Sequence, residues 1–271
     1  MKLFLDLHRQ YIRTARKDNE FGFDLKTVAK AEPWLSFLYD EWWGVDLAGL
    51  KHLPATGPVL LLGNAGGGIP WAGLMLLYGM MKHRESPRRL NIMADLDWIN
   101  DERVYNFARE IGFVPWSADN LKKLFAAGET VLIFPEGVPG SVKPFGERYR
   151  VRNFDWTRIL PAIEQGVPLV PVATLGADES FPVGTNLEKL ARVLSLPAFP
   201  VTPFFPWLPF PLNLMSLPVK WKIRIMKPVE YPAAYSRDDV EETAKRQALF
   251  VEGDVQAELN RLLRTRIKSL F

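Results

Sequence analysis

The sequence predicts an α/β fold: a single domain with a mixed, largely parallel sheet flanked by helices. Three observations predict it. Residues 58–63 form a continuous apolar run between Gly57 and a glycine cluster, which is typical of a strand buried on both faces. Helix, glycine and apolar strand then follow one another repeatedly along the chain. Finally, residues 238–270 carry apolar side chains at three-, four- and eight-residue spacings, which predicts a long amphipathic C-terminal helix.

The other elements follow from the same signals. Residues 37–53 suggest a helix that runs into a short extended segment. Apolar spacing and length predict helices over 71–82, 102–111, 117–127 and 156–165, and three of them are followed by the glycines Gly112, Gly128 and Gly166, which favour a helix end. Short apolar runs predict strands over 90–94, 130–134 and 168–173. Residues 220–226 alternate charged and apolar side chains, which predicts a half-exposed strand near an edge of the sheet.

Composition excludes several classes of function. A formal charge of +3 and a pI near 9.0 are too mild for a nucleic-acid-binding surface. The chain has no cysteine, which excludes disulfides, thiolate metal sites and thiol nucleophiles. The three histidines, His8, His52 and His83, do not lie at the spacing of a metal site. We therefore expect no bound metal and no nucleic-acid partner.

Charge at the two ends indicates a membrane surface or an ordinary solvated helix. The last dozen residues contain Arg261, Arg264, Arg266 and Lys268 without an acidic residue, and the first thirty contain seven Lys or Arg against four Asp or Glu. Charge interrupts the N-terminus before a secretory signal could form, so we expect a cytoplasmic protein. The uncharged window Val193–Val219 contains seven prolines, which argue against a membrane-spanning helix.

Two motifs carry the chemistry. The first runs Gly63-Asn64-Ala65-Gly66-Gly67-Gly68-Ile69-Pro70-Trp71-Ala72, and the second is Phe134-Pro135-Glu136-Gly137 at the end of a predicted strand. Together with Lys143–Tyr149, Val167–Val172 and Leu175–Pro182, they resemble the PlsC-like glycerolipid (lysophospholipid) acyltransferase superfamily, from roughly Trp34 to Val229. The resemblance is to the branch in which a Gly-Gly-x-Pro insert separates a catalytic His from its Asp. In this sequence Ala65 and Ala72 occupy those two positions.

The resemblance implies a reaction and a set of roles. A His removes the proton of an acceptor hydroxyl as it attacks the thioester of acyl-CoA or an acyl carrier protein, and an Asp orients the His. The implied substrate-binding residues are Asn64, Gly66, Gly67, Phe134, Pro135, Glu136, Gly137, Lys143 and Arg148. For Glu136 the alternative is a helix-capping or turn carboxylate, and for Lys143 and Arg148 it is solvated surface charge. No cofactor beyond the acyl donor is implied.

The family resemblance divides the chain into an N-terminal helical, membrane-facing segment (1–50), an acyltransferase domain (51–235) and a C-terminal helix (236–271). The expected location is the inner face of a membrane. The glycine insert favours neutral lipids or alcohols as acceptors over lysophosphatidate. Aromatic side chains at Phe199, Phe204, Phe205, Trp207 and Phe210 suit membrane contact or an acyl tunnel, or simply packing against the sheet.

Alanine at both catalytic positions, in otherwise matching surroundings, favours deliberate inactivation of a parent enzyme that has His and Asp there. A methyl group neither accepts a proton nor forms a hydrogen bond, so this copy is expected to be inactive. The alternatives are a natural pseudoenzyme that keeps lipid or acyl-carrier binding, and a noncatalytic membrane-surface scaffold or lipid carrier. An α/β hydrolase is a poor interpretation because the sequence contains no GxSxG motif.

Overall fold

The computed structural model describes residues 20–68, 70–83, 88–97, 99–193, 196–203, 216–231 and 237–268. Its helices are α2 (Leu25–Ser36), α3 (Trp71–Lys82), α4 (Glu102–Glu110), α5 (Ala118–Ala126), α6 (Gly137–Ser141), α7 (Leu160–Glu164), α8 (Ala177–Ser180), α9 (Glu188–Val193) and α10 (Arg237–Lys268). A π-helical turn covers Phe37–Trp42, and 3₁₀ turns cover Leu50–His52, Phe145–Glu147 and Trp156–Arg158. The strands are β1 (Asp46–Ala48), β2 (Val59–Gly63), β3 (Leu90–Ala94), β4 (Phe113–Pro115), β5 (Thr130–Ile133), β6 (Leu169–Leu175), β7 (Thr185–Asn186), β8 (Pro200–Val201) and β9 (Lys222–Ile225).

The main sheet has seven strands in the order β1-β9-β6-β2-β5-β3-β4. The five strands from β6 to β4 are mutually parallel, whereas β9 is antiparallel to β6 and parallel to β1. A separate two-stranded sheet joins β7 and β8. The predicted fold class, a mixed and largely parallel sheet flanked by helices, is confirmed.

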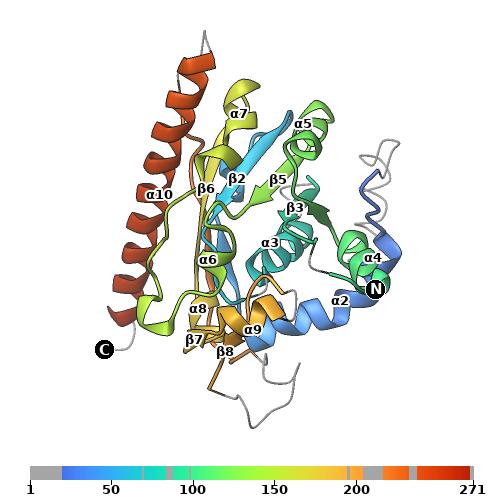
Figure 1. Ribbon diagram of the computed structural model, residues 1–271, viewed down its shortest axis with the longest axis vertical. Helices are drawn as coiled ribbons and strands as arrows, with labels where there is room; N and C mark the ends of the chain where they lie inside the picture. The colour runs from blue at the N-terminus through green and yellow to red at the C-terminus, as the bar shows by residue number, and fades with distance from the viewer. Residues whose placement is uncertain are drawn as a thin grey trace.

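Helices cover both faces of the sheet (Figure 1). Alternate residues of β2 point to opposite faces: Val59 and Leu61 pack with α3 and the N-terminal helices, while Leu60 and Leu62 pack with α5, α7 and α10. Every residue of β2, β5 and β6 is buried. This two-sided burial explains why these strands are continuous apolar runs in the sequence.

The long C-terminal helix was predicted correctly, and it lies along the sheet as a single element (Figure 1). One stripe of α10 is buried against the sheet, formed by Ala244, Ala248, Val251, Val255, Leu259 and Leu262. Among the described residues no helix is both long enough and apolar enough to cross a membrane. The predicted aromatic contacts of Phe204, Phe205, Trp207 and Phe210 and the basic N-terminal residues before Glu20 lie outside the described residues.

One of the predicted helices differs from the structure, and one strand of the main sheet was not predicted. Residues 156–165 are not one helix but a 3₁₀ turn followed by the short α7, which has Pro161 at its beginning. The three-residue strand β4 was not predicted, because Phe113–Pro115 is too short to show a periodic pattern. Strand β9 has the predicted half-exposed alternation and is next to the edge strand β1.

Candidate active site

The candidate site lies where three neighbouring parallel strands end. The first motif follows β2 at the centre of the sheet, the second follows β5 on one side, and Leu175–Pro182 follows β6 on the other. The carboxyl ends of parallel strands meet at one edge of the sheet, and α/β proteins commonly place ligand groups there. The topology therefore brings together three segments that are far apart in the sequence.

Asn64 ties the first motif to the neighbouring strand. Its side-chain amide donates to the Thr174 carbonyl at 3.0 Å, and its Oδ1 accepts the Thr174 N–H at 2.7 Å. Asn64 is buried, and its two bonds continue the β2–β6 pairing one step beyond the last paired residue of β2, Gly63. The residue before Ala65 is thus fixed to β6, and a substrate contact of Asn64 stays a prediction.

Glu136 holds the backbone at position 65. Its Oε1 accepts the Ala65 N–H at 2.7 Å, and its Oε2 accepts the Arg152 N–H at 2.7 Å. The side chain is 0% exposed. Glu136 stands at the N-cap position of α6, but its carboxylate makes no capping bond, so the capping alternative is wrong. The carboxylate instead bridges the first motif to the loop that follows the second.

Both alanine positions are buried. Ala65 is 2% exposed, and Ala72, in the first turn of α3, is 4% exposed. Ala72 belongs to the hydrophobic cluster that contains Trp43 and Trp221. The neighbouring Trp71 contacts Trp43 with ring centroids 5.8 Å apart, and its indole N–H is buried without a hydrogen-bond partner.

The glycines of both motifs are required by conformation or by space. Gly67 and Gly68 have φ of +78° and +69°, in the left-handed region that favours glycine. A Cβ on Gly66 would lie 2.4 Å from Asp178 Oδ1. Gly68 also donates its N–H to the Ser141 carbonyl at 2.9 Å, which joins the glycine loop to α6.

The rest of the second motif shapes the turn that presents Glu136. The Phe134 ring lies against Gly63 of β2, 3.1 Å from where a Cβ would be. Pro135 is buried, and its carbonyl accepts the Asp155 N–H at 3.1 Å. Gly137 has a φ of +62° and donates its N–H to the Phe134 carbonyl at 3.0 Å. These contacts are structural, and a substrate contact by any of these residues stays a prediction.

Lys143 is buried inside the site, which overturns the alternative of a solvated surface charge. Its side chain is 2% exposed, and Nζ lies 3.7 Å from Glu136 Oε2 and 3.4 Å from Asp178 Oδ2. Nζ also donates to the Arg150 carbonyl at 3.1 Å. The ammonium group therefore has three protein partners, and its predicted contact with phosphate or CoA remains a prediction.

Arg148 belongs to the same loop and is half-buried. It donates to the Phe145 carbonyl at 3.1 Å, and its guanidinium lies 4.4 Å from the Phe145 ring centroid and 5.2 Å from that of Tyr149. Its described contacts are with these two residues, so the structure does not bring Arg148 to Glu136. Its predicted role as a phosphate or CoA contact is untested.

Sequence reasoning missed two residues of the site, Asp178 and Tyr149. Asp178 accepts the Tyr149 N–H at 3.1 Å. Tyr149 has a φ of +69°, the one non-glycine residue with positive φ among the described residues, and Gln256 of α10 donates to its carbonyl at 2.9 Å. The signal for Asp178 was its place in the Leu175–Pro182 block, just after a buried strand. Tyr149 gave no signal, because a strained backbone cannot be read from residue type.

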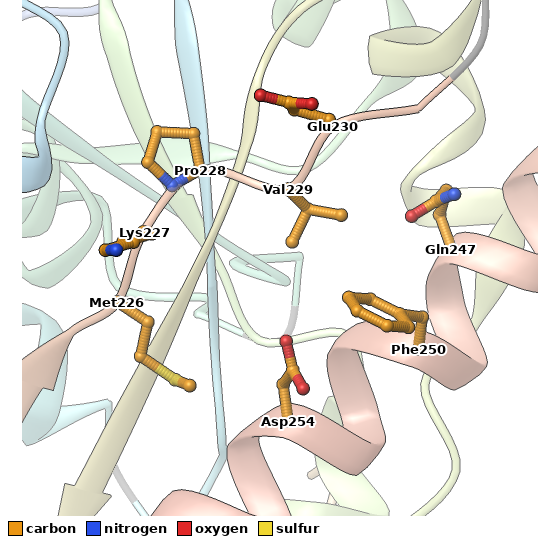
Figure 2. Close-up of a pocket in the computed structure, with 8 residues that line it drawn as sticks. All are labelled: Met226, Lys227, Pro228, Val229, Glu230, Gln247, Phe250 and Asp254. Carbon is orange, nitrogen blue, oxygen red and sulfur yellow. The ribbon is translucent and has the colours of Figure 1, made fainter.

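A groove of about 570 Å³ lies away from this site, between residues 226–230 and α10 (Figure 2). Phe250, Gln247 and Asp254 of α10 line one side of it. Val229 pairs with Leu169 at the beginning of β6, so the groove is at the amino end of the parallel strands. Ala65 follows β2 at the opposite, carboxyl end.

Comparison with known proteins gives the family. A family model described as Acyltransferase matches residues 44–175. An uncharacterized protein of Mycobacterium leprae is 34% identical over 258 residues, covering 93% of this chain and 70% of the relative. An uncharacterized protein of Mycobacterium tuberculosis (strain H37Rv) is 33% identical over 258 residues, covering 93% of this chain and 71% of the relative.

A solved structure shares the fold. The crystal structure of the 1-acyl-sn-glycerophosphate (LPA) acyltransferase PlsC from Thermotoga maritima matches with a TM-score of 0.54 at 15% identity, covering 96% of this chain and 93% of that chain. The chain belongs to the Acyltransferase family, and it has the fold of PlsC. The resemblance stated from the motifs is thereby confirmed at the level of the family.

The electrostatics of this acyltransferase site are set by two buried carboxylates that share one ammonium group. Burial is the largest influence and raises the pKa of Glu136 above its ordinary 4.5 and that of Asp178 above its ordinary 3.8. Lys143 and the backbone N–H donors act in the opposite direction. With both carboxylates ionised the cluster has a net charge of −1, so it retains a proton to higher pH than an exposed carboxylate does.

This raised pKa predicts how the stability of the acyltransferase depends on pH. A carboxyl group whose folded pKa is raised contributes stability that is complete below its unfolded pKa and is lost as pH rises through the folded value. We therefore expect Asp178→Asn to give a flatter profile of unfolding free energy from mildly acidic to neutral pH. Urea unfolding at a series of pH values measures this, and a variant profile parallel to that of the parent would contradict it.

Glu136→Gln is expected to destabilise the acyltransferase by about 1–3 kcal/mol. A glutamine has one acceptor oxygen, so either the Ala65 or the Arg152 N–H would face its NH₂ donor. Urea unfolding measures the cost. The matched control is Glu164→Gln, whose carboxylate is 38% exposed in a surface ion pair with Lys122, where we expect no more than about 1 kcal/mol. Equal costs for the two variants would refute the bridging role of Glu136.

Proposed function

We propose that this protein has the structure of an O-acyltransferase, an enzyme that transfers a fatty acyl group from acyl-CoA or an acyl carrier protein to a hydroxyl of a lipid or alcohol. We propose further that this copy of the enzyme is inactive. The observation that carries the proposal is the bond between Glu136 and the Ala65 N–H. Ala65 and Glu136 are 71 residues apart in the sequence, so this bond joins the two family motifs at the position where the family has its catalytic base.

The chemistry follows from what the two positions lack. An acceptor hydroxyl is a poor nucleophile until its proton is removed, and a positioned base contributes a rate factor of roughly 10²–10⁴. An imidazole at position 65 would take that proton as the oxygen attacks the thioester carbonyl carbon, and the carbon–sulfur bond would then break to release the thiol. Ala65 and Ala72 can neither accept the proton nor orient an acceptor of it.

The acceptor that we propose is an uncharged lipid or alcohol rather than a glycerol phosphate, following the glycine insert in the first motif. The Thermotoga maritima protein is described as acting on 1-acyl-sn-glycerophosphate, which makes lysophosphatidate the competing acceptor. The burial of Lys143 between two carboxylates is consistent with the uncharged class, since that ammonium already has partners.

A membrane surface is the proposed place of action, because a lipid acceptor is found there. Exposed Trp34 (49%) and Phe37 (47%) on the N-terminal helical segment support the proposal, since aromatic side chains favour the membrane–water interface. We propose a peripheral association with the inner face of a membrane. The domain division at residues 50 and 235 is part of the same proposal.

The second candidate is a natural pseudoenzyme or a noncatalytic lipid-binding protein. The burial of both alanine methyl groups favours it, because the chain packs well without the two polar side chains. The deciding experiment expresses the Ala65→His, Ala72→Asp double variant beside the chain as given, and compares the cellular lipids by mass spectrometry. New acylated lipids in the double variant alone support the acyltransferase. Lipid binding by both chains with no new product would overturn that proposal in favour of the noncatalytic one.

A further inference from the structure

Position 65 is held from two sides by side chains that lie outside the two catalytic positions. On one side, Glu136 accepts the Ala65 N–H at 2.7 Å. On the other, Asp178 Oδ1 fills the space beside Gly66, only 2.4 Å from where a Cβ would be. Carboxylates from two different segments therefore lie on the two sides of the residue-65 Cα, one bonded to its N–H and the other in close contact with Gly66.

Lys143 joins these two carboxylates. Its Nζ lies 3.7 Å from Glu136 Oε2 and 3.4 Å from Asp178 Oδ2, and its side chain is 2% exposed. The remaining interaction, with the Arg150 carbonyl at 3.1 Å, anchors the ammonium group to the loop backbone. A buried ammonium without partners is strongly unfavourable, so Lys143 keeps the two carboxylates where they are.

Asp178 is fixed in turn by the chain that follows the second motif. Its Oδ2 accepts the N–H of Tyr149, the residue with a left-handed backbone, at 3.1 Å. Non-glycine residues adopt that conformation at an energetic cost and keep it only where the surroundings impose it. The strain at Tyr149 thus serves to aim an N–H donor at Asp178.

We propose that Lys143 and Asp178 are positioning residues, which act through Glu136 and Gly66 to set the direction of the side chain at position 65 and the electrostatic potential that it experiences. This inference rests on the proposed function, in which that side chain is the base. It gives Lys143 a role different from binding phosphate or CoA.

The proposal predicts shifts of opposite sign for the two residues. Among the described residues, the charged groups next to position 65 are Glu136 from the β5 side and Asp178 from the β6 side, with Lys143 between them, and residues 63–68 carry no charge. Removing the positive charge favours a protonated imidazole, and removing a negative charge disfavours it. Lys143→Met is therefore expected to raise the pKa of an imidazole at position 65, and Asp178→Asn to lower it, each by about one unit.

The test needs no enzymatic activity. The variant Ala65→His adds one imidazole to the chain, and its NMR signal is identified as the one that the parent lacks. The pKa of this imidazole is measured in Ala65→His alone and in three double variants, which add Lys143→Met, Asp178→Asn or the control Lys122→Met. The control removes a lysine that is 43% exposed in a surface ion pair. The imidazole pKa is expected to rise with Lys143→Met, to fall with Asp178→Asn and to stay unchanged with Lys122→Met. Shifts in the same direction, or shifts no larger than the control's, would overturn the proposal.

If Lys143→Met does not fold, the milder variant Asp178→Asn still tests the proposal. Asp178→Asn keeps the shape and one acceptor oxygen for the Tyr149 N–H, so it decides the matter if Lys143→Met does not fold. Where the Ala65→His, Ala72→Asp double variant is active, Asp178→Asn is expected to lower kcat with little change in KM. Absence of activity in that double variant would refute the proposed function, while the imidazole pKa still tests the positioning role.

Discussion

Replacing Ala65 by His and Ala72 by Asp together is expected to produce acyl transfer that exceeds any rate of the chain as given by a factor of roughly 10²–10⁴, the contribution of a positioned general base. The backbone at position 65 is already held by Glu136, so the imidazole would be presented from a fixed point. The measurement is release of free thiol from acyl-CoA in the presence of a lipid alcohol, with the acylated product confirmed by mass spectrometry.

The two substitutions are expected to act as a pair. Position 72 is 4% exposed, so Ala72→Asp alone would bury a carboxylate without a partner and destabilise the protein, whereas Ala65→His would supply that partner. The matched control is Ala65→Gln with Ala72→Asn, which restores polar groups of similar size but no base. Equal rates in the control and in the His/Asp variant would show that proton removal at position 65 is not what the chain lacks.

Trp43→Ala is expected to lower the unfolding free energy by about 3–5 kcal/mol, the range for removing a buried large aromatic side chain. Trp43 is 0% exposed and stacks on Trp221 with centroids 4.5 Å apart and an interplanar angle of 19°. Its indole N–H also donates to the Leu217 carbonyl at 3.2 Å. The substitution leaves a cavity beside Trp71, the residue that precedes Ala72, and removes one of the two donors to the Leu217 carbonyl, which keeps its bond from the Val219 N–H.

The control for this prediction is another tryptophan that contacts Trp71. Trp34 contacts Trp71 with centroids 5.3 Å apart but is 49% exposed, so Trp34→Ala is expected to cost only about 1 kcal/mol. Urea unfolding of both variants beside the parent measures the difference. A cost for Trp43→Ala no greater than that for Trp34→Ala would mean that the stacked pair contributes little to the stability of the fold.

Much of the fold could be predicted because burial leaves a simple pattern. Strands covered on both faces are apolar throughout, which is why β2, β5 and β6 could be recognised, and α3 begins and ends at the predicted residues, Trp71 and Lys82. The order of the strands could not be read. The antiparallel insertion of β9 between β1 and β6 depends on contacts between distant segments, which no local pattern encodes.

The site was predictable to a lesser extent. The motifs indicated that position 65 and Glu136 belong together, and the structure joins them by a hydrogen bond. The partnership of Lys143 with Asp178 could not be read, because the two residues meet only after β5 and β6 have taken their places on either side of β2. A lysine in a polar loop is normally exposed, so the sequence left Lys143 as either a phosphate or CoA contact or a solvated charge, and neither interpretation includes a buried pairing with Asp178.

The stretch that matches the Acyltransferase family, residues 44–175, leaves out one strand of the main sheet and one of the helices that cover it. It contains β1, yet β1 is joined to the sheet through β9, which comes much later in the chain. It also contains β6, whose face opposite α3 is covered by α10, a helix outside the stretch. A fragment cut at those limits would leave β1 without its neighbouring strand and would expose the apolar residues of β6 that α10 covers, so truncation studies of this protein need to retain the chain through α10.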